Sequence, residues 1–219
     1  MKTITIDTYE FDELDDAAKE KARDWFRTAS YNDTFWSECE LEEAEDQASI
    51  MGIELDRDRD NSAKIFWSGF CSQGDGACFS GTWRACDVKP ATAVAIGWGP
   101  CKQTTELKRI AGVFADIAKE YPESSFTVKH SGRYCHENCT EFDYQFPDDD
   151  IGVDWPADKE HEWDTVCKAL KENAKDLMRW IYMQLEAAYE SENSDECVDD
   201  NIRCNNYAFT KAGKRTTVL

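Results

Sequence analysis

The segment with the most unusual chemistry is residues 65–83, where aromatic side chains flank a short, glycine-rich turn. Ser72, Gln73 and Asp75 lie in this turn beside Trp67, which predicts a loop that binds a small, nucleotide-like ligand. A purely structural interpretation is also open, in which the glycines supply the positive φ angles of a tight turn and the aromatic side chains belong to the core. The segment is not a phosphate-binding loop, because neither a Lys-Ser/Thr pair nor a helix directly follows it.

A second candidate for chemistry is the run Cys135, His136 and Cys139, in which two thiols four residues apart flank an imidazole. Thiolates and imidazoles are ligands that zinc prefers, but no second closely spaced pair of cysteines completes a set of four. Folding would have to supply the remaining ligands from Cys71, Cys78, Cys86 or His130. A hairpin turn with incidental thiols explains the same residues. We therefore expect no cofactor, with zinc as the alternative.

Catalytic groups are scarce in this sequence. Cys71 or Ser72 could act as a nucleophile with His130 or His136 as its base. With 3 histidines and 45 acidic residues in the chain, such a pairing arises by chance alone. The sequence therefore predicts a protein that is not an enzyme and that has no catalytic residues.

Helical spacing of apolar residues predicts a helix that begins after Asp12 or Asp15, and further helices along the chain. These cover residues 35–51, 107–118 and 158–190, with a short helix at 195–204. At about 1.5 Å per residue the helix 158–190 would be about 48 Å long. A small compact domain does not need such a length, so we expect part of this helix either to project from the domain or to pack against a second subunit in a homo-oligomer.

Alternating or aromatic-rich runs predict strands at residues 2–9, 63–70, 78–86, 92–98, 125–131, 140–146 and 207–210. The strands 63–70 and 78–86 are expected to form one hairpin, and 125–131 and 140–146 a second one. The order of elements predicts an α+β fold, in which an antiparallel β-sheet packs with amphipathic helices and one long C-terminal helix. We expect a single domain over residues 1–219.

Charge is distributed unevenly along the chain, which carries 45 acidic against 25 basic residues and a net charge of −20. Residues 1–60, an acidic strand-helix-helix segment, have a net charge of −12, from 19 acids and 7 bases. The β-rich residues 61–146, with one helix, are balanced at 9 and 9, and residues 147–219, an acidic loop, long helix and tail, have a net charge of −8. Phosphates and anionic membranes would repel such a chain, so we expect no direct binding of nucleic acid or membrane.

The carboxylates concentrate on one face of the helix 35–51 and in the loop after the last hairpin. At these places they could imitate spaced phosphates and contact a basic groove. The residues we expect to bind a partner are Glu38, Glu42, Glu43, Glu45, Asp46, Asp148, Asp149 and Asp150. Charge that serves solubility is the alternative explanation.

Several blocks of the sequence resemble a known family. They read FDEL at 11–14, AKEKARDW at 18–25 and SGFCSQGDGA at 68–77, and a further block covers 194–215. Together they resemble an uncharacterised family of phage and prophage proteins whose members are often labelled antitoxin-like. The resemblance implies a phage origin and supplies no catalytic residues.

Charge and resemblance together predict a phage-encoded anti-defence protein that binds a host immune complex, such as a CRISPR effector or a defence nuclease. The partner would be a host defence protein with a basic groove. The alternatives are a protein that sequesters a nucleotide-like ligand, and an antitoxin that neutralises a basic toxin. No window reaches the ~18 apolar residues of a membrane span and no apolar signal region begins the chain, so we expect a protein of the host cytoplasm.

Overall fold

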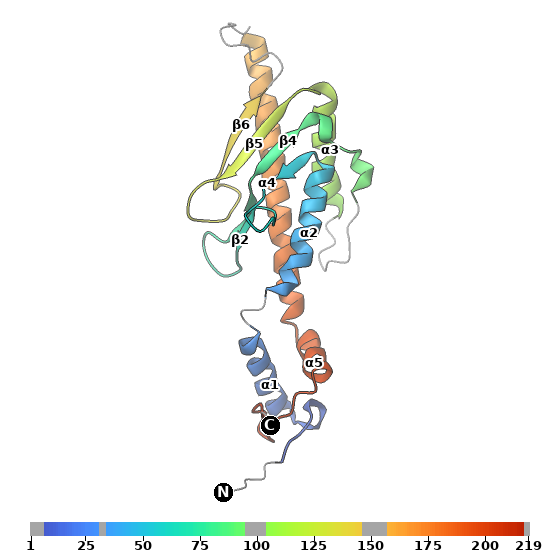
Figure 1. Cartoon of the computed structure of the whole chain (residues 1–219), viewed down its shortest axis with the longest axis vertical. Coiled ribbons are helices and arrows are strands. Elements are labelled where there is room, and N and C mark those ends of the chain that lie inside the picture. Colours follow the sequence, from blue (N-terminus) through green and yellow to red (C-terminus); the bar gives the residue numbers. More distant parts are fainter. Residues whose placement is uncertain (1–6, 31–33, 95–103, 146–156, 217–219) are drawn as a thin grey trace. The chain divides into compact units, whose positions relative to one another are not determined.

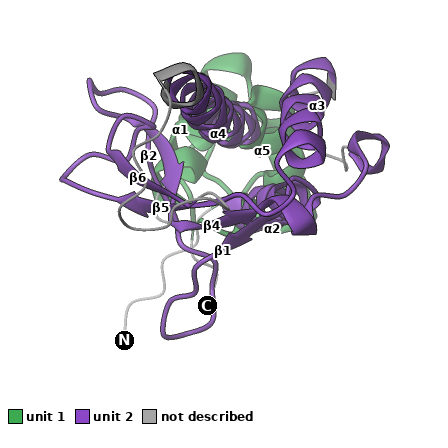
Figure 2. Cartoon of the chain, turned by 90° about the horizontal axis from the view of Figure 1, so that it is seen from above, with its two compact units in different colours: residues 1–36, 189–219 green, residues 37–188 purple. Residues whose placement is uncertain are grey.

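The computed structural model describes residues 7–30, 34–94, 104–145 and 157–216. The chain forms two compact units, which we call unit 1 (residues 1–36 and 189–219) and unit 2 (residues 37–188) (Figure 2). Unit 1 combines the two ends of the chain, and unit 2 is its uninterrupted middle. The two acidic segments of the sequence therefore each contribute residues to both units.

Unit 2 is built on an antiparallel sheet with the strand order β1-β4-β5-β6 (Figure 1). Its strands are β1 (Ile53–Leu55), β4 (Gly81–Arg84), β5 (Ser125–His130) and β6 (Thr140–Gln145). A separate hairpin contains β2 (Ile65–Ser68) and β3 (Gly76–Phe79). The predicted hairpin of residues 125–131 and 140–146 is confirmed, since β5 and β6 pair from Ser125 with Gln145 to His130 with Thr140.

Three long helices of the chain are α2 (Phe35–Ile50), α3 (Thr104–Glu120) and α4 (Ala157–Glu192). They confirm the predicted helices at 35–51, 107–118 and 158–190, with ends that differ by a few residues. With the antiparallel sheet they confirm the α+β fold and its long C-terminal helix. In α3 the helical spacing places Leu107, Ile110 and Phe114 in the core, where all three side chains are buried.

A row of large side chains crosses the sheet and forms its buried face. Strand register places Ile53 opposite Trp83, Trp83 opposite Phe126, and Phe126 opposite Tyr144. The rings of Trp83 and Phe126 stack with centroids 5.4 Å apart and planes 17° apart. Trp83 also donates a hydrogen bond of 2.9 Å from Nε1 to the carbonyl oxygen of Met51. Its polar atom is therefore satisfied inside the core.

Helices α3 and α4 cover this face of the sheet, on one side of it (Figure 2). Phe114 of α3 lies 5.8 Å from Trp83, measured between ring centroids. The Tyr144 hydroxyl donates to the carbonyl oxygen of Cys167 in α4 at 3.2 Å. The apolar residues of α4 within unit 2 are buried by the chain itself: Leu170, Ala174, Leu177, Ile181 and Leu185. Burial of this stripe therefore needs no second subunit, and the predicted homo-oligomer stays a prediction.

The predicted strand 78–86 is wrong as a single strand, because the chain changes its pairing partner at Ser80. The Ser80 N–H donates to the carbonyl oxygen of Lys64, next to β2. Its carbonyl oxygen accepts from the N–H of Asp56, next to β1. Residues before Ser80 pair with β2, and residues after it pair with β1 and β5. A continuous run of aromatic and small residues gives no signal for such a switch.

Other expectations for strands have mixed outcomes. Strand β1 was not predicted, since three residues are too few for an alternating pattern. Residues 91–93 form a turn of 3₁₀ helix instead of the start of a strand, and the rest of 92–98 lies mostly outside the described residues. Most of the expected strand 2–9 also lies outside them. Residues 207–210 contribute isolated bridges, in which Phe209 pairs with Tyr9 and Arg215.

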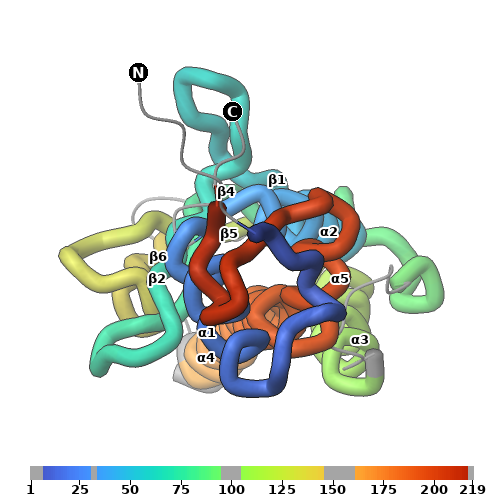
Figure 3. Tube along the Cα trace, turned by 90° about the horizontal axis from the view of Figure 1, so that it is seen from below, coloured from blue at the N-terminus to red at the C-terminus, as the bar shows by residue number. Residues whose placement is uncertain are grey.

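Unit 1 packs the start of the chain against its end, and the two segments run side by side in Figure 3. Helix α1 (Asp16–Ala29) is capped by Asp15, whose side chain accepts from the N–H of Ala18, as the sequence predicts. Helix α5 (Asp195–Cys204) confirms the predicted 195–204. Arg23 donates two hydrogen bonds of 2.7 and 2.8 Å to Asp199. The core of the unit consists of Phe11, Leu14, Ala18, Ala22, Val198, Ile202 and Phe209.

We predict opposite effects for alanine at two glycines of unit 2. At Gly81 a Cβ would lie 2.5 Å from the Glu54 carbonyl oxygen of β1, so Gly81→Ala should lower the free energy of unfolding by about 1–3 kcal/mol. At Gly112 inside α3 a Cβ would meet nothing within 4 Å. Gly112→Ala should therefore raise the free energy of unfolding by about 0.5–1 kcal/mol. Urea unfolding measures both, and a stable Gly81→Ala variant would contradict the close pairing of β1 and β4.

Candidate functional site

Three acidic side chains form a regular row along the exposed side of α2. Glu38, Glu42 and Asp46 are exposed and stand four residues apart, so successive members lie about 6 Å apart along the helix axis. None of the three forms an ion pair with a described residue. Like charges four residues apart repel each other along a helix, and only Glu38, in the first turn, gains from the helix dipole. We call Glu38, Glu42 and Asp46 the acidic row.

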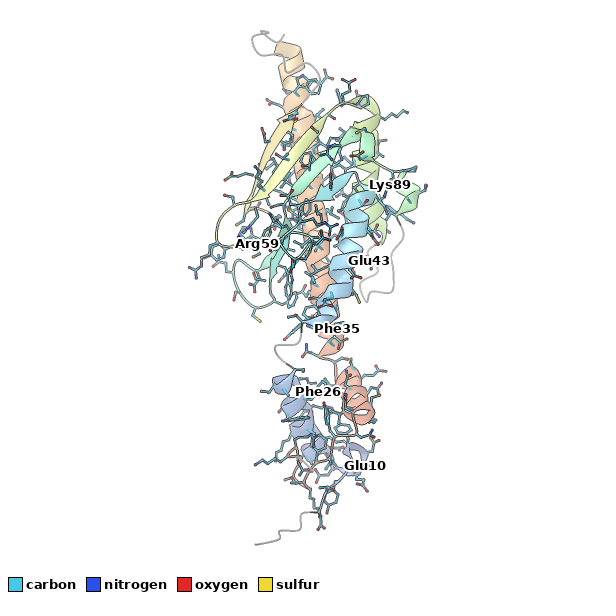
Figure 4. All side chains as sticks on the ribbon, viewed as in Figure 1. Glu10, Phe26, Phe35, Glu43, Arg59 and Lys89 are labelled. Carbon is cyan, nitrogen blue, oxygen red and sulfur yellow. The ribbon has the colours of Figure 1, made fainter. Side chains whose placement is uncertain are left out.

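The other predicted acidic residues lie differently. Glu43, labelled on α2 in Figure 4, is half-buried and interacts within the chain. Glu45 forms an ion pair with Arg57, whose Nη1 donates to Oε2 at 3.1 Å. Asp148, Asp149 and Asp150 lie outside the described residues. The structure thus brings three of the eight predicted partner-binding residues together on one exposed face.

Glu40 departs from the sequence expectation, which assigned it to the exposed acidic side of the helix. Its residue surface is only 8 % exposed, and Oε2 has no hydrogen-bond partner. Burial raises the pKa of Glu40 above its usual value, and the neighbouring Glu43 carboxylate adds to the increase. The buried side of α2 also contains Ser37 and Gln47. Ala44 and Ala48 are buried on the same side, as their helical spacing indicates, so the sequence misplaced Glu40 and not the buried side of the helix.

The glycine-rich turn between β2 and β3 is organised by Asp75. Its Oδ2 accepts hydrogen bonds from the N–H groups of Ser72 at 2.6 Å and Cys71 at 2.8 Å. Its Oδ1 accepts from the Ser68 hydroxyl at 3.2 Å. Both oxygens are therefore used inside the turn, which agrees with the structural interpretation of Asp75. Ser72 and Gln73 remain exposed at the tip.

This turn contacts the loop between β5 and β6, so two segments that the sequence singled out separately meet in space. A Cβ at Gly74, whose φ is +122°, would lie 2.6 Å from Cδ1 of Tyr134. A Cβ at Gly76 would lie 2.6 Å from the Cβ of His136. Only glycine allows this close approach. We call the contact between residues 69–76 and 131–139 the hairpin junction.

Aromatic rings surround the junction. Tyr134 is 50 % exposed and stacks on His136 with ring centroids 6.2 Å apart. Trp67 stacks on Phe70 at 6.0 Å, and Phe70 lies 5.4 Å from Tyr182 of α4. Trp67 is thus near the turn, as expected for a ligand-binding loop, but it also belongs to an internal aromatic cluster. Sequence reasoning missed Tyr134 and Tyr182, because their contacts depend on the fold alone.

The histidines of the junction are engaged by groups other than the suggested nucleophiles. His130 Nε2 donates to the carbonyl oxygen of Tyr134 at 2.9 Å, and its ring stacks on Phe66 at 4.4 Å. His136 Nδ1 accepts from the N–H of Asn138 at 3.2 Å. Neither imidazole is hydrogen-bonded to Cys71 or Ser72. The described geometry therefore assembles no nucleophile and base from these four residues.

Three thiols gather beside the junction, where Cys78 of β3 lies near Cys135 and Cys139. Burial raises the pKa of Cys78 to about 12, and the two neighbouring thiols add to the increase. The Cys139 sulfur lies 3.5 Å from His136 Nε2. Yet no group of three or more His, Cys, Asp or Glu among the described residues is placed to hold a metal ion.

Comparison with known proteins assigns the chain to a family. The profile of DUF8835, a domain of unknown function, matches residues 36–195, and the chain belongs to this family. The match contains the acidic row, the hairpin junction and all of unit 2. No curated protein and no solved structure matches the chain. Among the described residues no helix is sufficiently long and apolar to span a membrane.

We predict that Asp75 stabilises the protein only when it is ionised. The N–H groups of Ser72 and Cys71 hold the pKa of Asp75 below its usual value. Its contribution is therefore complete above the unfolded pKa of about 3.9 and is lost as the pH falls through the lower folded value. Asp75→Asn should be less stable than wild type at pH 7, and the difference should vanish in strong acid. Denaturant unfolding between pH 2 and 7 measures this, and a pH-independent difference would contradict it.

The buried Glu40 should make the free energy of unfolding depend on pH in the opposite direction to Asp75. Because its folded pKa is raised, the stabilisation that protonated Glu40 contributes is complete below the unfolded pKa of about 4.3 and is lost as the pH rises through the raised folded value. Glu40→Gln should therefore raise the free energy of unfolding at pH 7 by about 1 kcal/mol, and by nothing at pH 3. Glu42→Gln is the matched control from the acidic row, with an expected change within about 0.5 kcal/mol. Equal effects of the two variants would contradict the burial of Glu40.

Proposed function

We propose that this protein is a phage-encoded inhibitor that binds a host immune complex, in the host cytoplasm, through the acidic row of α2. The observation that carries the proposal is the regular spacing of three exposed carboxylates without ion-pair partners in the described structure. A groove that normally holds nucleic acid presents Lys and Arg to a similarly regular series of phosphates. The phage origin rests on the resemblance of the sequence blocks, and the proposal assigns no catalytic role.

Charge supports the proposal in two further ways. A net charge of −20 raises the rate at which a basic surface captures the protein, because long-range attraction steers the encounter. Exposed carboxylates also remain hydrated until they meet a partner, so the α2 row is available for binding. The exposed side of α4 carries both signs, since Lys168 and Glu172 are both exposed, and it does not extend the row.

Two alternative functions, an antitoxin and a nucleotide-sequestering protein, are also compatible with this structure. An antitoxin would present the same acidic row to a basic toxin, so the identity of the bound protein separates it from the inhibitor. A nucleotide-sequestering protein would use the exposed tip of the hairpin junction at Ser72 and Gln73 instead. The engagement of both Asp75 oxygens within the turn leaves that tip without a carboxylate to recognise a base or ribose, which favours the acidic row.

The test uses DNA-cleavage assays with purified CRISPR effectors and defence nucleases. We expect the protein to inhibit at least one of them, and inhibition should weaken as salt rises. The triple variant Glu38→Lys, Glu42→Lys and Asp46→Lys should inhibit at least about tenfold less, because repulsion replaces attraction at each position. Unfolding curves check that the variant is folded.

A matched control separates the row from net charge. Asp116, Glu123 and Asp164 are exposed, form no ion pair with a described residue and belong to α3, the turn after it and α4. Their replacement by Lys changes the net charge equally and should leave inhibition within about twofold of wild type. An equal loss of inhibition in both triple variants would mean that net charge alone, and not the acidic row, determines inhibition. Full inhibition by the row variant would overturn the proposal.

A further inference from the structure

A groove of about 760 Å³ lies between β6 and α4 in unit 2, away from the acidic row and the tip of the hairpin junction. Strand β6 contributes a hydroxyl and two aromatic rings to it, and α4 contributes three ammonium groups. The residues concerned are Thr140, Phe142, Tyr144, Lys168, Lys171 and Lys175, and the carboxylates of Glu141 and Glu172 also line the groove. The helix side therefore has a net positive charge from three lysines and Glu172, and the strand side combines two aromatic rings with Glu141.

The three lysines form a stripe at positions i, i+3 and i+7 of α4, which places them on one side of the helix. None of them forms an ion pair with a described residue. Lys171 Nζ lies 5.8 Å from the centroid of the Phe142 ring, and Lys175 Nζ donates to Oδ1 of Asn138 at 2.9 Å. Like charges on one side of a helix repel each other. Glu172 lies on the same side of α4 and forms no ion pair with a described residue, so the three ammonium groups remain available to an anionic ligand.

The strand side of the groove offers a second kind of contact. Strand β6 is the last strand of the sheet, and among the described residues it pairs only with β5 (Figure 1). The backbone groups of an edge strand that point away from the sheet can pair with another extended chain. Phe142 and Tyr144 are half-buried and lie on the face of the strand toward α4. A peptide beside β6 would therefore run along the lysine stripe.

We propose that this groove binds an extended acidic segment of a partner protein, which adds to the edge of β6 as a further strand. Main-chain hydrogen bonds to β6 would supply affinity. Alternate side chains of a strand point to the same face, so carboxylates at every second position would meet the lysines of α4. A nucleic acid forms no such main-chain pairing, so the free edge of β6 favours a peptide. This site is separate from the acidic row and does not depend on it.

Fluorescence anisotropy with a labelled heptapeptide of alternating Glu and Val tests the proposal on the full chain. We expect wild type to bind it and to ignore the peptide with Lys in place of Glu. The variant Lys168→Gln/Lys171→Gln should weaken binding about tenfold, because two charge-assisted contacts are lost. The matched control Lys108→Gln/Lys119→Gln removes two exposed lysines of α3 and should bind within about twofold of wild type.

Hydrogen exchange locates the bound peptide. Addition of the Glu-Val peptide should slow amide exchange within residues 140–145, because new main-chain hydrogen bonds form along β6. No peptide binding, equal affinity of both double variants, or protection elsewhere would overturn the proposal. Tighter binding of a single-stranded oligonucleotide that the Lys168→Gln/Lys171→Gln variant loses would assign the groove to nucleic acid and overturn the peptide. Variants of the acidic row leave this experiment unchanged, so the two proposals fail separately.

Discussion

The stack of Trp83 on Phe126 is the contact on which unit 2 depends. It joins β4 to β5 at the centre of the sheet, and through Phe114 it fixes α3 against the same face. The hydrogen bond from Trp83 Nε1 to the Met51 carbonyl oxygen ties the end of α2 to this core. A large aromatic side chain buries much apolar area and fixes its neighbours through its shape. The positions of α2 and of the strands beside α4 therefore all follow from one stacked pair.

Close backbone approach is the second constraint, and it brings the two hairpins together. At the hairpin junction Gly74 and Gly76 allow the loop of Tyr134 and His136 to lie directly on the turn. At Gly81 the chain leaves its pairing with β2 and joins β1 and β5. A side chain at any of these positions would separate elements that the Trp83 stack holds in place. These glycines thus allow the strands and loops around the aromatic core to approach one another closely.

The sequence predicts a helix wherever one side is apolar, as in α3 with Leu107, Ile110 and Phe114. In α2 the same reasoning found the helix and its buried Ala44 and Ala48, but it placed Glu40 on the exposed side, where the structure does not have it. The strand switch at Ser80 was also invisible, since it depends on partners distant in sequence. The hairpin junction was predicted only as two separate segments, and the lysine stripe was not predicted, because its meaning requires β6 beside it.

The two proposed surfaces, the acidic row and the lysine stripe, have one property in common. The acidic row and the lysine stripe lie on different helices of unit 2, and each keeps its charges free of ion pairs within the described residues. Arginines behave differently, since Arg57, Arg109 and Arg179 all pair with carboxylates of their own unit. Neither set of like charges is neutralised by an ion pair within the described residues, and like charges on one side of a helix cost stability. The family match over residues 36–195 contains both surfaces.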